Sequence, residues 1–274
     1  MGLLSQAEQV VAGPDPALGP MEPSGWGEVF QPFTLQHLVS VLGCAAITAL
    51  VIGLGVAWRG QDRERLLRRA LGIGVIITQS TSEIYWMFIT PFNRSEAFPF
   101  HLCDVAVWCV AFAMLTEKRW ARTVVYFLGL ALSTQGFFTP TLRFGHEHVR
   151  FWFFWIGHTQ IVGAALYFFI ANRYRPNWRD FIVASVVTVA WLGFVFPLNL
   201  ILGTNYGYVG RKDPSNPTIV QKLGPWPWRV LIMMGMTFVA FVAVWMIGEG
   251  VARFEGQRRR GFTAEDAEDA EAES

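Results

Sequence analysis

The sequence predicts an all-α protein, a polytopic transmembrane bundle of about seven helices, and three observations support this. Charged residues make up only 16% of the 274 residues, whereas a soluble domain carries about 25%. Apolar residues account for 53% of the chain, and its mean hydropathy is +0.34. The charges lie in short blocks between long apolar runs, which is the pattern that a bilayer imposes.

Seven apolar runs approach the length of about 20 residues that a membrane-spanning helix needs. They lie near residues 36–58, 68–90, 99–116, 121–138, 149–171, 180–202 and 227–250. The third and fourth runs are short and also fit a single re-entrant pair. The basic residues between them, Lys118, Arg119 and Arg122, favour an ordinary loop between two spans.

The basic residues orient the predicted bundle, because cytoplasmic loops carry an excess of Lys and Arg. Of the 22 basic residues, 15 lie after the first, third and fifth runs and in the C-terminal tail. The other 7 lie in the remaining loops. We therefore expect a multi-pass protein of the cell membrane with its N-terminus outside and its C-terminus in the cytoplasm.

Three segments follow from this arrangement. Residues 1–34 form a flexible outer segment, residues 35–252 form the seven-helix membrane domain, and residues 253–274 form a disordered cytoplasmic tail, first basic and then acidic. Residues 1–34 hold no Lys or Arg, so they lack the basic start of a cleavable signal peptide. The net charge of +1 does not indicate a nucleic-acid partner, and we expect none.

Polar side chains inside the apolar runs gather in the outer half of the predicted bundle. Ionisable groups within a membrane span are costly, so they are candidates for function. The loop between the sixth and seventh runs opens with two further polar residues and closes with the sequence GPWPW, which predicts a stiff lid on the same side. The residues concerned are Glu83, His101, Cys103, Asp104, Gln135, Thr139, His158, Asn199, Asn205 and Tyr206.

The segment PFHLCD, residues 99–104, contains the most informative spacing. His101 and Asp104 are three residues apart and share a helix face, whereas His101 and Cys103 project about 200° apart. A base for Cys103 must therefore come from another helix, and His158 is the other histidine at a plausible depth. Cys103 lies near a helix N-terminus, where the helix dipole favours a thiolate. Such a pair suits acyl transfer through a thioester.

Each of these residues also has a purely structural explanation. Cys103 can be a small buried apolar residue, and His158 can form a hydrogen bond between helices. Cys44 and Cys109 have no polar neighbours in the sequence and are interpreted as packing residues. His146 and His148 have the spacing of two metal ligands but no evident third ligand. We therefore expect neither a metal nor a cofactor.

Five segments in order resemble a known family: PFHLCD at 99–104, QGFFTP at 135–140, WIGHTQI at 155–161, FPLNLILGTNYGY at 196–208 and LGPWPW at 223–228. The sequence resembles the YwaF-like bacterial integral membrane proteins, which are related to the eukaryotic transmembrane protein 164. That relative is associated with acyl transfer onto lysophospholipids and requires a cysteine and a histidine. The resemblance implies Cys103 as the cysteine and either His101 or His158 as the histidine.

Two hypotheses follow. In the first, an enzyme acts on (lyso)phospholipids of the membrane: Cys103 attacks an acyl ester, His158 is the base, and Asp104 or Glu83 orients it. Hydrogen bonds from Asn199 or Asn205 would stabilise the oxyanion. The substrate-binding residues would be Glu83, Gln135, Thr139, Asn199, Asn205 and Tyr206.

A more distant similarity, to lipid hydrolases with a Thr and a His, also points to Thr139, although Cys103 is the nucleophile we predict. In the second hypothesis, the protein is a non-catalytic transporter or ligand sensor. Glu83, Asp104 and His158 would then form a proton or ligand site. The sequence leaves open whether water or a second lipid accepts the acyl group, and it leaves open the oligomeric state.

Overall fold

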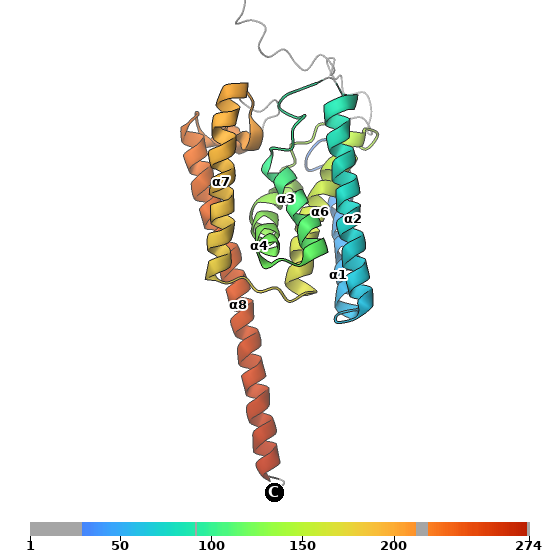
Figure 1. Cartoon of the computed structure of the whole chain (residues 1–274), viewed down its shortest axis with the longest axis vertical. Helices are drawn as coiled ribbons and strands as arrows, with labels where there is room; N and C mark the ends of the chain where they lie inside the picture. Colours follow the sequence, from blue (N-terminus) through green and yellow to red (C-terminus); the bar gives the residue numbers. More distant parts are fainter. Residues whose placement is uncertain (1–28, 91, 212–218, 273–274) are drawn as a thin grey trace, which may run out of the picture.

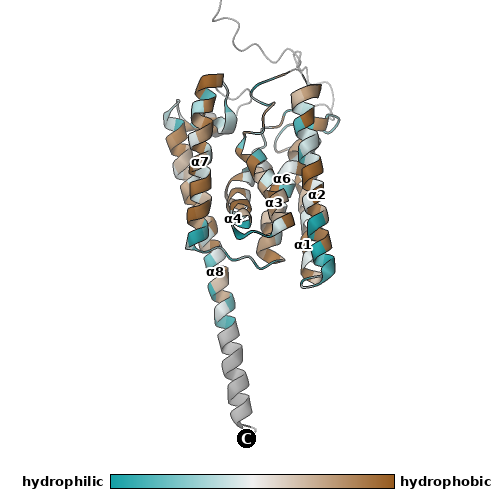
Figure 2. Ribbon diagram, viewed as in Figure 1, coloured by the Kyte–Doolittle hydropathy of each residue, from teal (hydrophilic) through white to brown (hydrophobic). Residues whose placement is uncertain are grey.

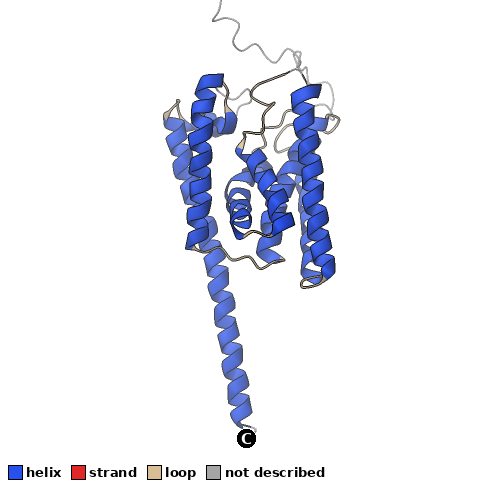
Figure 3. Cartoon of the chain, viewed as in Figure 1, coloured by secondary structure: helices blue, strands red, loops and turns tan. Residues whose placement is uncertain are grey.

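The computed structural model describes residues 29–90, 92–211 and 219–272 (Figure 1). Within these residues the chain is helical apart from its loops (Figure 3), and one isolated antiparallel bridge joins Val29 to Phe144. The predicted all-α fold is confirmed. The flexible segment predicted for residues 1–34 falls almost entirely on residues 1–28, outside the described part of the chain.

Seven helical segments in the described part of the chain correspond to the seven predicted apolar runs. Two of the segments continue as π-helical turns, η1 after α2 and η2 after α4. Two short 3-10 helices, η3 and η4, lie between the last two segments. The bounds are α1 Leu35–Ala57, α2 Asp62–Ile84, η1 Tyr85–Ile89, α3 Leu102–Thr116, α4 Arg119–Phe127, η2 Leu128–Ser133, α5 Gln135–Phe138, α6 Val149–Ile170, α7 Trp178–Leu202, η3 Tyr206–Tyr208, η4 Ile219–Leu223 and α8 Trp228–Ala272.

Four helices among the described residues are long and apolar enough to cross a membrane, namely α1, α6, α7 and the part of α8 up to Arg258. Helix α3 is apolar but has only 15 residues. The two short helices, α3 and α4, lie in the middle of the bundle, between α1 and α2 on one side and α7 and α8 on the other (Figure 1). The sequence also predicted that α2, α3 and α4 cross the membrane, and this stays a prediction.

The buried core of the bundle is centred on α3, α4 and α6. Tyr126 and Phe127 of α4 and Tyr167 and Phe168 of α6 are fully buried. By contrast, only 6% of the apolar window of α1 is buried. Because α1 exposes so much apolar surface, that surface fits a lipid environment rather than water. Figure 2 shows the same distribution, with hydrophobic residues along the outer helices and hydrophilic residues at their lower ends.

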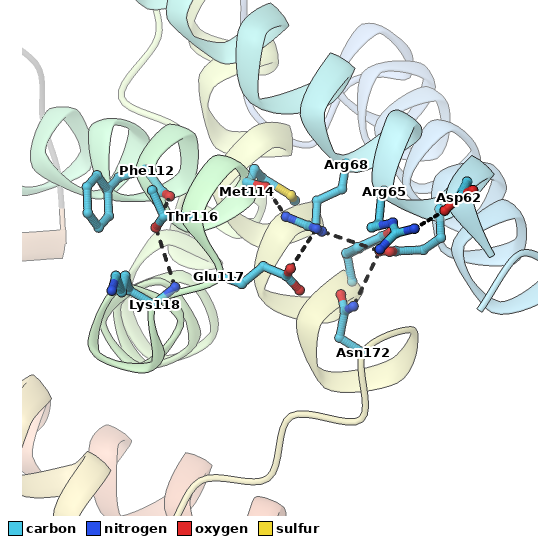
Figure 4. A network of polar contacts seen from close by, with 11 residues as sticks. Asp62, Arg65, Arg68, Phe112, Met114, Thr116, Glu117, Lys118 and Asn172 are labelled. Atoms are coloured by element: carbon cyan, nitrogen blue, oxygen red, sulfur yellow. Dashed lines mark hydrogen bonds and ion pairs between the residues drawn. The ribbon is translucent and has the colours of Figure 1, made fainter. Parts of the chain in front are cut away.

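The two ends of the bundle differ. Helices α3 and α6 begin at the upper end in Figure 1, which we call the site end; the turns after α1, α3 and α6 lie at the opposite end. At the opposite end, Arg68 of α2 is only 3% exposed. Its guanidinium donates to the carbonyl of Met114, in α3, and to Oε2 of Glu117, the residue after α3, at 2.7 Å (Figure 4).

The buried charge of Arg68 is further compensated by Glu64, whose Oε1 lies 3.5 Å from Arg68 Nε. Glu64 also accepts hydrogen bonds from the Tyr167 hydroxyl at 2.7 Å and from Asn172 at 3.3 Å. A buried charge is tolerated only when it is paired in this way. These contacts fasten α2 to α3 and α6 at the opposite end. The sequence placed Arg68 at the start of an apolar run beside a basic loop and did not predict its burial.

Helix α8 continues past residue 252, where the sequence predicted a disordered tail, and ends at Ala272. It projects well beyond the bundle at the opposite end (Figure 1). Arg175, in the turn before α7, holds it through Glu255, with Nη2 and Oε1 2.6 Å apart. The tail is rich in Ala and Glu, which are good helix formers. Because the membrane helix before it is already formed, the tail can extend that helix without the cost of nucleation.

Candidate functional site

The structure brings Cys103 and His158 together at the site end. Cys103 is the second residue of α3, and His158 lies in the middle of α6. The Cys103 sulfur is 3.9 Å from His158 Nε2. This is looser than the 2.6–3.2 Å or so of a catalytic hydrogen bond, and such pairs are commonly looser before a substrate binds.

The hydrogen bonds of His158 determine which of its nitrogens faces the thiol. Nδ1 lies 2.8 Å from the carbonyl oxygen of Phe154, one turn earlier in α6. A carbonyl can only accept, so Nδ1 carries the proton and the Nε2 lone pair faces Cys103. The Phe154 ring also packs on the imidazole, with centroids 4.2 Å apart. In this arrangement, His158 Nε2 can accept the proton of the Cys103 thiol, as a general base does.

Two residues that the sequence analysis did not select complete the surroundings of this pair. A Cβ atom on Gly136 would overlap His158 Cδ2 and lie 2.7 Å from Nε2, so only glycine leaves room for the imidazole. The Ser133 side chain lies beside the Cys103 sulfur. Both lie where α4 passes through the π-helical turn η2 into α5. The glycine of QGFFTP was the one signal in the sequence for this position. The sequence alone does not reveal that this glycine packs against His158.

His101 has a different role. Its Nδ1 accepts from the Gly207 backbone N–H at 3.4 Å, and its Nε2 lies 3.3 Å from the carbonyl oxygen of Ser95. The ring also contacts Tyr206, with centroids 5.2 Å apart. Both ring nitrogens are therefore engaged: Nδ1 ties the start of α3 to the loop after α7, and Nε2 ties it to the loop before α3. Of the two histidines left open by the sequence, His158 is the one beside Cys103.

Glu83 links α2 to α3, whereas Asp104 caps the start of α3. Asp104 Oδ2 accepts the His101 backbone N–H at 3.0 Å. Glu83 Oε1 accepts from Trp108 Nε1 at 2.7 Å and from Gln79 Nε2 at 3.1 Å. The group that orients His158 is the Phe154 carbonyl, where the sequence predicted one of these carboxylates.

Asn199 closes the loop after α7 on itself. This side chain is 2% exposed, and its Nδ2 donates to the Tyr206 carbonyl at 2.9 Å. Its Oδ1 accepts from Thr204 Oγ1 at 2.9 Å and from the Tyr206 N–H at 2.8 Å. Tyr206 in turn donates its hydroxyl to the Arg94 carbonyl. Burial raises the pKa of Tyr206 to about 12, so this hydroxyl stays a neutral donor.

The loop after α7, which the sequence predicted as a lid, is held by internal hydrogen bonds where the structure describes it. Trp226 Nε1 donates to the Val209 carbonyl at 3.1 Å, which joins the two ends of the loop; residues 212–218 lie outside the described residues. Asn205 Oδ1 accepts the Gly210 N–H at 2.8 Å, while its Nδ2 is buried and has no hydrogen-bond partner among the residues that the structure describes. Of the two asparagines, Asn205 therefore has an amide group available to a ligand.

Gln135 and Thr139 are exposed at the two ends of α5. The Thr139 hydroxyl donates to the Gln135 carbonyl at 3.4 Å, within the same turn. Among the described residues, no hydrogen bond joins either side chain to Cys103 or His158. The same part of the chain contains no group of three or more His, Cys, Asp or Glu residues that could hold a metal.

An all-helical bundle with several apolar helices and its polar cluster at one end defines an integral membrane protein. The chain belongs to the TMEM164 family, because the family model matches residues 32–246. That range contains every residue of the site described above and all helices except the far part of α8. No curated protein and no solved structure matches the chain significantly.

Proposed function

We propose that the protein transfers acyl groups of membrane phospholipids through a thioester on Cys103. The observation that carries the proposal is the 3.9 Å approach of His158 Nε2 to the Cys103 sulfur, with the tautomer set by Phe154. In the first step Nε2 takes the thiol proton, and the sulfur attacks the ester carbonyl carbon. Collapse of the tetrahedral intermediate expels the lysolipid alkoxide, which takes that proton back from His158.

The second step reverses these roles. His158 removes a proton from the hydroxyl of an acceptor lysolipid, whose oxygen attacks the thioester carbonyl. The thiolate leaves and regains the proton, so the cysteine and histidine end as they began. If water replaces the acceptor, the same steps amount to hydrolysis. The buried Nδ2 of Asn205 supports its role as a donor to the oxyanion.

The remaining roles follow from position. Glu83 holds α2 against α3 through Trp108, and Asp104 caps the start of the helix that carries Cys103. Asn199 and Tyr206 keep the cover over the site in place, and Gln135 and Thr139 are exposed to contact a bound lipid. The distribution of basic residues supports a site end that faces the outside of the cell membrane.

The test is to trap the thioester in the full-length protein. The protein in detergent is incubated with acyl-labelled phospholipids, and its intact mass is measured before and after hydroxylamine treatment. We expect a hydroxylamine-sensitive acyl adduct that maps to the peptide containing Cys103. If no adduct forms with any phospholipid and lysolipid turnover is absent, the protein is a ligand-binding or transport protein instead.

Gly136→Ala is expected to slow acylation by about 10- to 100-fold, because a displacement of about 1 Å at a reacting group has an effect of this size. The added Cβ would push the His158 imidazole away from Cys103. The control is Gly157→Ala, next to His158 in α6, where a Cβ meets nothing within 4 Å. Single-turnover acylation measures both variants, and equal rates would show that the position of His158 does not matter.

A further inference from the structure

Arg150 lies in the first turn of α6 between two aromatic rings. Its guanidinium carbon is 4.2 Å from the ring centroid of Trp86, in η1, and 4.8 Å from that of Phe144, in the loop before α6. Its Nε is buried and has no hydrogen-bond partner in the described part of the chain. Both distances are within the range of cation–π contacts, which hold the cation through the ring faces and do not use its N–H donors. The cation is therefore held in a fixed orientation without its donors being used.

The charge of Arg150 is not compensated by a carboxylate among the described residues. At the opposite end, Arg68, Arg119 and Arg175 each pair with a carboxylate. Burial, and after it the Arg150 charge, lower the pKa of the neighbouring His148. A fixed cation without an acidic partner is suited to an anion that the protein itself does not supply.

The position of Arg150 relates this cation to the reactive pair. Arg150, Phe154 and His158 follow one another at intervals of four residues and form one stripe along α6. Arg150 stands eight residues before His158, roughly 12 Å nearer the site end at 1.5 Å per residue. In a phospholipid, the phosphate likewise lies nearer the membrane surface than the ester carbonyls. A phosphate at Arg150 would thus bring an ester toward Cys103.

We propose that Arg150 binds the headgroup phosphate of the substrate lipid and so selects glycerophospholipids over neutral glycerolipids. This inference rests on the proposed acyl transfer, whose substrate site it extends by one specificity residue. Planar guanidinium donors match the oxygens of a phosphate and bind it with charge-assisted hydrogen bonds. Arg150 takes no part in the proton transfers and acts only by positioning the lipid.

Lipid binding can be measured without turnover. Wild type, Arg150→Gln and Arg94→Gln are titrated in a neutral detergent with a dioctanoyl phospholipid, with dioctanoylglycerol and with inorganic phosphate, and the shift in Tm is recorded. Arg94 is the matched control, because it is an exposed arginine in the loop between η1 and α3. We expect Arg150→Gln to bind the phospholipid about 10- to 100-fold more weakly, the range for losing hydrogen bonds to a charged group. Dioctanoylglycerol should bind all three proteins equally.

The outcomes are distinct. Equal losses for the phospholipid and dioctanoylglycerol, or equal losses in both arginine variants, would overturn the inference. Stabilisation by inorganic phosphate alone would show a free-anion site and would also overturn it. If Arg150→Gln does not fold, Arg150→Lys replaces it. Lysine keeps the positive charge but lacks the planar guanidinium. Unchanged phospholipid affinity of Arg150→Lys would count against a bidentate contact between Arg150 and the phosphate. A phosphate-specific loss without any acyl adduct would support Arg150 while contradicting acyl transfer.

Discussion

Cys103→Ala is expected to lose the acyl adduct completely and to lower lipid turnover by about 10³-fold or more, as removal of a nucleophile does. The Cys103 sulfur is the nucleophile that lies within 3.9 Å of His158 Nε2, so its removal leaves the proposed base without the thiol it serves. The loss should appear in kcat, with lipid binding retained. Intact-mass spectrometry and a lysolipid turnover assay measure both quantities.

Cys109→Ala is the matched control for this experiment. Cys109 lies in the same helix, packs against the same apolar core and has no polar partner among the described residues. The two variants lose a sulfur of the same kind, and both should retain a Tm close to that of the wild type. If Cys103→Ala still turns over lipid at the rate of Cys109→Ala, the sulfur is a packing atom and the nucleophile lies elsewhere.

His158→Ala should slow acylation by about 10²- to 10⁴-fold, which is the range for removal of a general base. Without Nε2, the thiolate must form by proton loss to solvent, so the residual rate should rise with pH where the wild type levels off. Single-turnover acylation as a function of pH measures this difference. A residual rate that does not depend on pH would contradict the role of His158 as the base.

His101→Ala distinguishes the two histidines that the sequence left open. It removes the ring that accepts the Gly207 N–H and contacts Tyr206, so we expect a lower Tm. Acylation should persist in the protein that remains folded. If His101→Ala abolishes acylation while His158→Ala does not, the assignment of the base is wrong, and the loop after α7 must move to bring His101 to the thiol.

The apolar runs and the geometry of a helix were sufficient to predict the helical segments and to select His158 as the partner of Cys103. The apolar runs marked the helices, because a bilayer leaves few alternatives to a helix. The angular separation of residues 101 and 103 on one helix excluded His101 as a direct partner of the thiol. Depth along the predicted spans then left His158. These arguments need only helix geometry and no knowledge of neighbouring helices.

The details around the pair depend on tertiary contacts, which periodicity does not specify. The sequence suggested carboxylates as the groups that orient His158. In the structure, the carbonyl of Phe154, one turn earlier in the same helix, accepts the hydrogen bond from His158 Nδ1. It also offered Asn199 as an oxyanion donor, whereas Asn199 bonds to the loop that follows it. The π-helical turn η2, which brings Ser133 and Gly136 to the site, adds one residue to a helical turn and leaves no clear pattern in the sequence.

The pairing of the buried Arg68 with the buried Glu64 and the half-exposed Glu117 has a consequence for the two leaflets of the membrane. A lipid passing along α2, α3 and α6 to the opposite end would have to separate this pairing, and breaking a buried pair costs about 3–5 kcal/mol. Substrate and product are therefore expected to enter and leave on the same side. Each reaction would remodel the fatty-acid composition of one leaflet only, and compositional asymmetry would accumulate until a separate flippase or scramblase dissipated it.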